Sequence, residues 1–146
     1  MDKVLKAKVL LVDDEEDFLS TLAERLETRG LKVSTANSGE LALARIEKEG
    51  FDLIILDLAM PGMDGLETLK RIKTKQPEAE IIILSGQGSI KTSIEAMKLG
   101  AEDFMEKPVN ISELLDKISD AKDKRFQVLE SKSVKDIETI LKNKGW

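Results

Sequence analysis

The chain has 146 residues, of which 41% are hydrophobic and 35% charged, and its formal net charge is −5. It contains no cysteine and no histidine, which excludes disulfides, thiolate metal sites, a Cys nucleophile, a Ser-His-Asp triad and a phosphohistidine within this chain. An acidic chain of this composition is typical of a soluble globular protein rather than a nucleic-acid binder, and we expect it to be cytoplasmic, with neither a signal peptide nor a membrane span.

Five short apolar runs predict β-strands, and longer segments of helical periodicity separate them. The runs are KVLLV (8–12), KVSTA (32–36), DLIIL (52–56), EIIIL (80–84) and EDFM (102–105). In the first helical segment, one face is predicted to carry Phe18, Leu19, Leu22 and Leu26. In the second, the shared face is predicted to carry Leu41, Leu43 and Ile46.

Three of the predicted helices stop at a glycine, at Gly30, Gly50 and Gly100. Glycine tolerates the left-handed backbone that often follows the last helical residue, so these positions are stop signals. Repeated β-α units predict a parallel sheet with helices on both faces. The first, third and fourth strands are the most continuously apolar, which favours their placement at the centre of the sheet.

Polar residues follow four of the predicted strands. They are Asp13 and Asp14 after the first, Asp57 after the third, Ser85 after the fourth, and Lys107 with Pro108 after the fifth. Open α/β sheets bind ligands at this edge, and in the strand order 2-1-3-4-5 the three carboxylates converge. Their mutual repulsion calls for a cation. Mg²⁺ fits best, because it uses few carboxylates and accepts phosphate oxygens as ligands. The metal and Lys107 would then offset the charge of Asp57.

Each residue alone also has a simpler structural interpretation. Asp13 or Asp14 can cap the helix that starts near Glu15, and Asp57 can begin the turn before Pro61. Independent structural roles would not place carboxylates at the ends of two strands, a hydroxyl at the end of a third and a lysine at the end of a fourth. The combined pattern therefore favours a site.

The segments LLVDDE, DLIILDLAMPGMDG, IIILSG and SIEAMKLGAEDFMEKP, in this order and spacing, resemble the receiver domain of two-component response regulators. The resemblance implies a flavodoxin-like (βα)5 doubly wound sandwich with sheet order 2-1-3-4-5. We expect the receiver domain at residues 1–122. Residues 123–146 hold six basic and four acidic side chains, net +2, and are expected to form a short helical extension rather than an effector domain.

The resemblance also implies a role for each site residue. Asp57 would be the phosphoacceptor, a carboxylate nucleophile. Asp14 would bind Mg²⁺ directly, Asp13 mainly through water, and Ala59 through its backbone carbonyl. Lys107 would bind a phosphoryl oxygen.

The remaining implied roles concern the peptide bond after Lys107 and the switch. The bond between Lys107 and Pro108 would be cis. Ser85 would swing in to hydrogen-bond the phosphoryl group, and Phe104 would rotate into the space it vacates. Phe104 stands where the family often has tyrosine, so no hydroxyl hydrogen bond would follow; its simpler interpretation is a core residue of its strand. The switching surface would comprise the fourth strand, fourth helix and fifth strand.

The implied phosphoryl donor is a sensor histidine kinase or a phosphotransfer protein, and the implied output is contact with a downstream protein. We expect no binding of nucleic acid or membrane by this chain, and homodimerisation on phosphorylation stays open. The chain would be a stand-alone receiver or a fragment of a longer regulator. It would not be an enzyme, beyond catalysing its own phosphorylation and dephosphorylation.

Three alternatives compete with this interpretation. An aspartate-nucleophile phosphohydrolase commonly needs a second acid two positions after the nucleophile, where this chain has Ala59. A nucleotide binder would use the segment GQGS, but Gly86 and Gly88 lack the third glycine of a dinucleotide fingerprint. A receiver-like scaffold that acts without phosphorylation is disfavoured, because every acidic, hydroxyl and lysine position is present.

Overall fold

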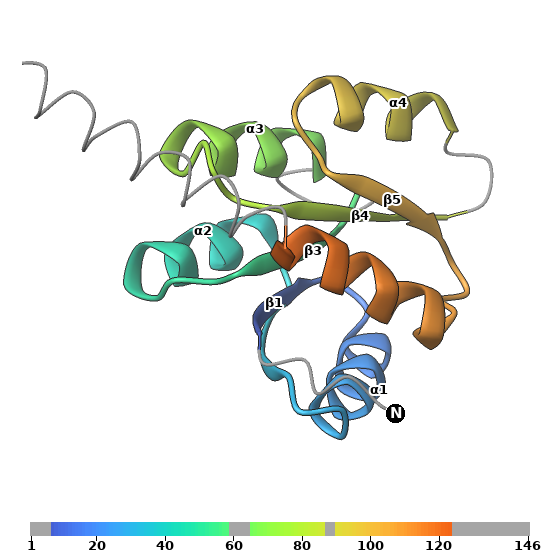
Figure 1. The fold of residues 1–146 in the computed structure, drawn as a ribbon. Helices are drawn as coiled ribbons and strands as arrows, with labels where there is room; N and C mark the ends of the chain where they lie inside the picture. Colours follow the sequence, from blue (N-terminus) through green and yellow to red (C-terminus); the bar gives the residue numbers. More distant parts are fainter. Residues whose placement is uncertain (1–6, 59–64, 87–89, 124–146) are drawn as a thin grey trace, which may run out of the picture.

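The computed structural model describes residues 7–58, 65–86 and 90–123. Its strands are β1 (Lys8–Val12), β2 (Lys32–Ala36), β3 (Leu53–Asp57), β4 (Ile81–Ser85) and β5 (Asp103–Glu106). Its helices are α1 (Glu16–Glu27), α2 (Gly39–Lys48), α3 (Gly65–Lys75) and α4 (Ile90–Lys98), and residues 111–123 form a further helix. Strands and helices alternate along the chain, as Figure 1 shows.

The five strands form one parallel sheet in the order β2-β1-β3-β4-β5. This confirms the predicted flavodoxin-like α/β fold. The predicted bounds of β1 and β2 agree with the structure, whereas β3, β4 and β5 each lie one residue later than predicted. The reason is the pairing register, which joins Asp57 to Leu84 and Ser85 to Glu106. Both polar residues therefore end their strands instead of following them.

Side chains of the central strands alternate between two apolar layers. Leu53 and Ile55 contribute to the layer beneath α1 and the helix at 111–123, which we call the α1 face. Ile54 and Leu56 contribute to the layer beneath α2, α3 and α4. Both faces of the sheet are thus covered by helices (Figure 1), which explains why the central strands read as continuous apolar runs.

Two details of the helix predictions are wrong. Leu41 is 39% exposed, because it lies off the helical face formed by the buried residues Leu43 and Ile46. Gly50 was expected to have left-handed backbone, but α2 ends through an extended Glu49 with φ −135°. The other two expectations hold, since Gly30 and Gly100 have φ values of 91° and 109°.

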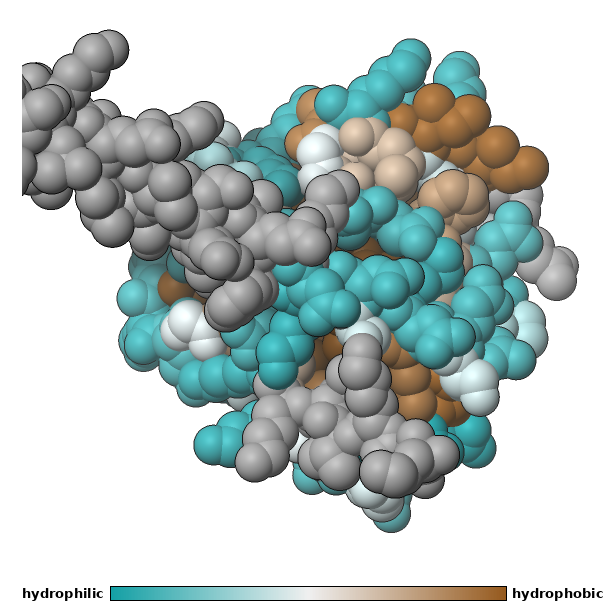
Figure 2. Space-filling view, viewed as in Figure 1, coloured by the Kyte–Doolittle hydropathy of each residue, from teal (hydrophilic) through white to brown (hydrophobic). Residues whose placement is uncertain are grey.

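Exposed apolar side chains gather on the outer face of α4. Ile90 and Ile94 are 61% and 50% exposed, and Figure 2 shows a brown patch at the upper right, over α4. The interpretation of Phe104 as a core residue is wrong, because its side chain is 38% exposed. It alternates with the buried Met105 on β5, which is an edge strand and is covered less completely than the centre.

Within the described ranges, no helix has the length and apolar composition needed to cross a bilayer. The expected helical extension lies beyond residue 123, and Ala59 lies in the gap between residues 58 and 65, so both predictions fall outside the described residues.

Candidate functional site

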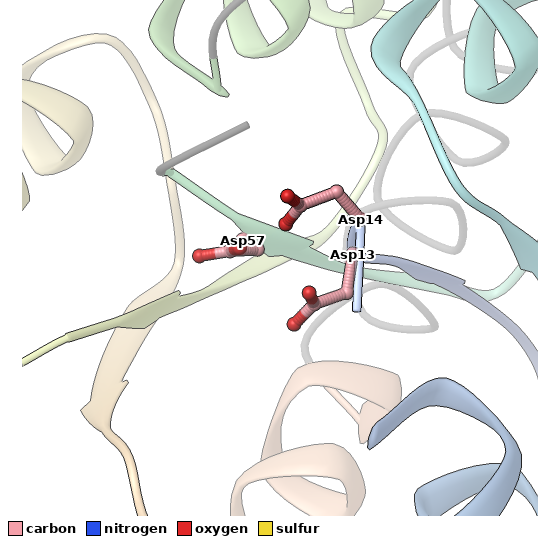
Figure 3. A group of neighbouring side chains, drawn as sticks. All are labelled: Asp13, Asp14 and Asp57. Carbon is pink, nitrogen blue, oxygen red and sulfur yellow. The ribbon is translucent and has the colours of Figure 1, made fainter. Parts of the chain in front are cut away.

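Three aspartates meet at the carboxyl ends of β1 and β3. Asp13, Asp14 and Asp57 each offer a carboxylate oxygen, and these oxygens all lie within 4.8 Å of one another (Figure 3). Asp13 and Asp57 are buried, with exposures of 1% and 3%, while Asp14 is exposed. Carboxylates so close together repel each other, and burial strengthens the repulsion. The arrangement therefore needs positive charge.

The backbone fixes Asp13 by extending the β1–β2 ladder one residue further. Its N–H donates to the carbonyl of Ala36 over 3.1 Å, and its Oδ1 accepts from the N–H of Glu15 over 3.0 Å. Glu15 is the N-cap of α1 and makes no side-chain cap of its own. The capping interpretation of Asp13 is thus partly right: one oxygen orders the chain into α1 and the other faces the site.

Lys107 supplies the positive charge from the end of β5. Its Nζ donates to Asp13 Oδ2 over 2.7 Å and lies 3.8 Å from Asp57 Oδ2 and 3.5 Å from Glu15 Oε1. Lys107 therefore bonds Asp13 more closely than Asp57, whereas the sequence suggested only that Lys107 offsets the charge of Asp57. The backbone explains its place, because the Lys107 N–H donates to the Ser85 carbonyl over 2.8 Å and prolongs the β4–β5 pairing. The bond between Lys107 and Pro108 is cis.

The pKa of Lys107 is raised above its ordinary value of 10.5. Burial, the strongest single influence, lowers it by disfavouring the charged form. The hydrogen bond to Asp13 and the charges of Asp57, Asp13 and Glu15 raise it and together outweigh burial. Lys107 is therefore a permanent cation at neutral pH.

Ser85 and Phe104 lie on the face of the sheet opposite the α1 face. Ser85 keeps the phase of Ile81 and Ile83 on β4, and Ile83 pairs with Phe104 on β5. The Ser85 hydroxyl is buried and donates to the Met105 carbonyl over 3.5 Å, a long hydrogen bond. A hydroxyl held this loosely can turn toward another acceptor at little cost.

Sequence reasoning missed Phe18 as part of the site. The Lys107 Nζ lies 4.4 Å from the centroid of the Phe18 ring, on the side of α1. Phe18 was predicted only as a helix-face residue, and it is indeed partly buried against the α1 face. No local pattern pairs it with Lys107, since the two residues come from opposite ends of the domain.

Sequence reasoning also missed the role of Gly65. A Cβ at this position would lie 2.3 Å from the Leu58 Cα and 2.7 Å from the Asp57 carbonyl oxygen, so α3 starts in backbone contact with the end of β3. The Gly65 N–H donates to the Leu58 carbonyl over 3.1 Å. Only glycine permits this approach, which fixes the backbone directly after Asp57.

The three aspartates fit a divalent metal ion. Hard cations of this kind prefer carboxylate oxygens, and the exposed Asp14 leaves the cluster open to solvent on one side. One lysine cannot neutralise three carboxylates, which leaves a net negative site. Among the described residues, this is a cluster built to hold a small cation together with an anionic group.

Comparisons with known proteins agree with this geometry. A family model described as the response regulator receiver domain matches residues 9–119. The transcriptional regulatory protein ZraR of Klebsiella oxytoca is 38% identical over 113 residues, which cover 77% of this chain and 26% of ZraR. The nitrogen assimilation regulatory protein NtrX of Azorhizobium caulinodans is 42% identical over 109 residues, which cover 73% of this chain and 24% of NtrX.

The solved structures give the same result. The receiver domain of NtrX from Brucella abortus has a TM-score of 0.76 and 36% sequence identity, with coverage of 79% of this chain and 98% of that domain. The chain spans about a quarter of the length of the two curated relatives, ZraR and NtrX.

Proposed function

Because the chain belongs to the family of response regulator receiver domains, we propose that its Asp57 accepts a phosphoryl group from a histidine kinase or phosphotransfer protein in a Mg²⁺-dependent reaction. A receiver domain is a phosphoacceptor signalling module rather than a classical enzyme. The observation that carries the proposal is the buried Asp57 carboxylate, which lies beside Asp13 and Asp14 and 3.8 Å from the Lys107 ammonium.

The surroundings of the three carboxylates favour Asp57 as the nucleophile. Asp57 is buried at the end of the central strand β3, and its Oδ2 lies 3.8 Å from the Lys107 ammonium. Asp14 is instead exposed to water, and Asp13 orders the start of α1 through the Glu15 N–H. One Asp57 oxygen attacks phosphorus, an O–P bond forms, the N–P bond of the donor phosphohistidine breaks, and the imidazole nitrogen leaves with the electron pair.

Phosphoryl transfer depends on positioning and charge neutralisation rather than on acid-base groups, which suits a chain without histidine. Mg²⁺, held by Asp13, Asp14, Asp57 and the Ala59 carbonyl, would neutralise charge on the phosphoryl oxygens. Lys107 hydrogen-bonds a phosphoryl oxygen after leaving Asp13, and Ser85 turns from the Met105 carbonyl toward the new group.

The output surface is formed by β4, α4 and β5. The phosphoryl group adds a charge of about −1.5 to −2, and it shifts the conformational equilibrium only by stabilising one state more than the other. Ser85 and Phe104 share the face of the sheet that α4 covers, and α4 exposes Ile90 and Ile94. Movement of Ser85 and Phe104 therefore changes an apolar surface that a downstream protein contacts.

The proposal extends to the organisation of the chain. Residues 1–122 form the receiver and residues 123–146 an extension, the location is cytoplasmic, and this chain itself binds neither nucleic acid nor membrane directly. The name of ZraR, a transcriptional regulatory protein, supports an output in gene regulation, reached by protein contact. A stand-alone receiver and a fragment of a longer regulator are both consistent with this role, as is homodimerisation on phosphorylation.

Intact mass measured after incubation with Mg²⁺ and acetyl phosphate tests the proposal. We expect one added phosphoryl group in the wild type and in Asp17→Asn, an exposed residue of α1 outside the cluster, and none in Asp57→Asn or with EDTA. An absence of both labelling and phosphate release in the wild type would instead favour a scaffold that acts without phosphorylation. Continuous phosphate release with little labelled protein would leave rapid self-dephosphorylation and phosphohydrolase turnover to be separated.

A further inference from the structure

The Phe18 ring lies against the Lys107 ammonium from the side of α1. The distance of 4.4 Å from Nζ to the ring centroid lies well inside the range of cation–π attraction. The Lys107 side chain is only 19% exposed, so water screens this attraction weakly. Phe18 belongs to α1 and is partly buried against the apolar layer of the α1 face. Its ring therefore has a fixed position beside the flexible side chain of Lys107.

The Phe18 ring and the carboxylates interact with the Lys107 ammonium in different ways. A lysine ammonium has three N–H donors, and one of them binds Asp13 Oδ2 over 2.7 Å. An aromatic ring attracts the positive charge without needing an N–H directed at it. Phosphorylation of Asp57 leaves the ring chemically unchanged. Its hold on Nζ therefore persists while the hydrogen-bond partner of Nζ changes from Asp13 to a new oxygen at Asp57.

We infer that Phe18 is a positioning residue for phosphoryl transfer, holding the Lys107 ammonium at the mouth of the site while it exchanges Asp13 for a phosphoryl oxygen. The inference rests on the proposed function of Asp57 and adds a residue to it. Without the ring, the four-carbon stem of Lys107 gains conformations directed to water, and the ammonium is in place for a smaller fraction of the time.

The first test is geometric and independent of phosphorylation. Ring current from Phe18 should shift the NMR signals of the Lys107 ε-methylene protons upfield in the wild type. The shift should disappear in Phe18→Leu, which keeps an apolar side chain of similar bulk, and persist in Phe18→Tyr. Equal ε-proton shifts in the wild type and Phe18→Leu would overturn the inference.

The second test measures the rate constant for addition of a phosphoryl group by acetyl phosphate at saturating Mg²⁺, followed by intact mass. We expect Phe18→Leu to react about three- to tenfold more slowly, in line with the strength of a partly desolvated cation–π contact. Phe18→Tyr should restore the rate. In a Lys107→Met background, Phe18→Leu should have no further effect, because the ring acts only through the ammonium.

Phe51→Leu is the matched control. Phe51 makes the same kind of contact with Lys8, at 5.2 Å, at the opposite edge of the sheet, and it is a buried residue of the other apolar layer. It should lower the free energy of unfolding without slowing phosphorylation. Equal phosphorylation rates for Phe18→Leu and the wild type would overturn the inference but not the proposed function. The same would follow if Phe18→Leu slowed phosphorylation equally in the wild-type and Lys107→Met backgrounds. A wild type that shows neither labelling nor phosphate release would overturn the proposed function, and the inference with it.

Discussion

Lys107 is a single residue on which the electrostatics of the site depend. Its ammonium lies within 4.0 Å of the carboxylates of Asp13, Asp57 and Glu15, and the raised pKa shows that their attraction exceeds the cost of burial. The same charge opposes any second cation. Lys107 and a metal ion thus compete electrostatically for the same carboxylates, even though both contribute to binding an anionic group.

Removing the charge of Lys107 should therefore tighten metal binding. We expect Lys107→Met to lower the dissociation constant of Mg²⁺ about fivefold or more, because even unit charges 4 Å apart in water interact by about 1 kcal/mol, and burial increases this. Isothermal titration calorimetry of the two proteins with MgCl₂ measures the change.

Lys117→Met provides the control for this titration. Lys117 pairs with Asp103 over 2.6 Å, outside the aspartate cluster, so its loss should leave Mg²⁺ affinity unchanged. Weaker Mg²⁺ binding by Lys107→Met than by the wild type would show that Lys107 orders the carboxylates more than it repels the metal.

At the scale of elements, the junction between β3 and α3 determines where Asp57 lies. The strand ends at Asp57, the Leu58 N–H still donates to the Leu84 carbonyl over 3.2 Å, and Gly65 then brings α3 back against the same backbone. The register of β3 on β4 and the return at Gly65 together hold the carboxylate at the sheet edge.

Gly65→Ala should disturb this junction directly. The new Cβ would lie 2.3 Å from the Leu58 Cα, so backbone must move, and we expect a loss of about 1–3 kcal/mol in the free energy of unfolding. Denaturant unfolding measures this loss, and acetyl phosphate labelling should slow in parallel. Gly50→Ala has nothing within 4 Å of its new Cβ and should change stability by less than about 1 kcal/mol. Similar effects of the two substitutions would refute the close approach at Gly65.

The elements also mark how far sequence reasoning reaches. Continuous apolar runs predicted the central strands, because strands buried on both faces carry apolar side chains throughout. The full strand order 2-1-3-4-5 followed from the resemblance to receiver domains. The ends of β3 and β4 were misplaced by one residue, since pairing partners, not polarity, decide where a strand stops. Leu41 was assigned to the wrong face of α2, because a few apolar residues do not define which side of a helix is buried.

The site also has features that the sequence predicted and features that it did not. The aspartates could be predicted to converge because each lies at the carboxyl end of a strand in one parallel sheet. The choice of Asp13 as the closest partner of Lys107, across 94 positions of sequence, could not be predicted. It depends on the side-chain geometry of residues on different strands, which only the folded chain brings together.

At the scale of the whole molecule, folding concentrates negative charge at one edge of the sheet. The chain has a net charge of −5, and two of the three clustered carboxylates are buried. The unfolded chain separates Asp57 from Asp13 and Asp14, so the repulsion between Asp57 and that pair opposes folding. A cation that binds only the folded cluster should therefore stabilise the entire domain.

We accordingly expect Mg²⁺ to raise the melting temperature of the wild type, with a gain of about 2.7 kcal/mol at a hundredfold excess over its dissociation constant. For a domain of this size, that corresponds to a shift on the order of 10 °C, measurable by thermal unfolding followed by circular dichroism. Asp14→Asn should abolish most of the shift, and because Asp14 is exposed, its replacement should cost little stability in the absence of metal. NaCl at matched ionic strength controls for general screening, which acts on all surface charges. A Mg²⁺ shift of equal size in the wild type and Asp14→Asn would place the stabilising ion elsewhere than among the three aspartates.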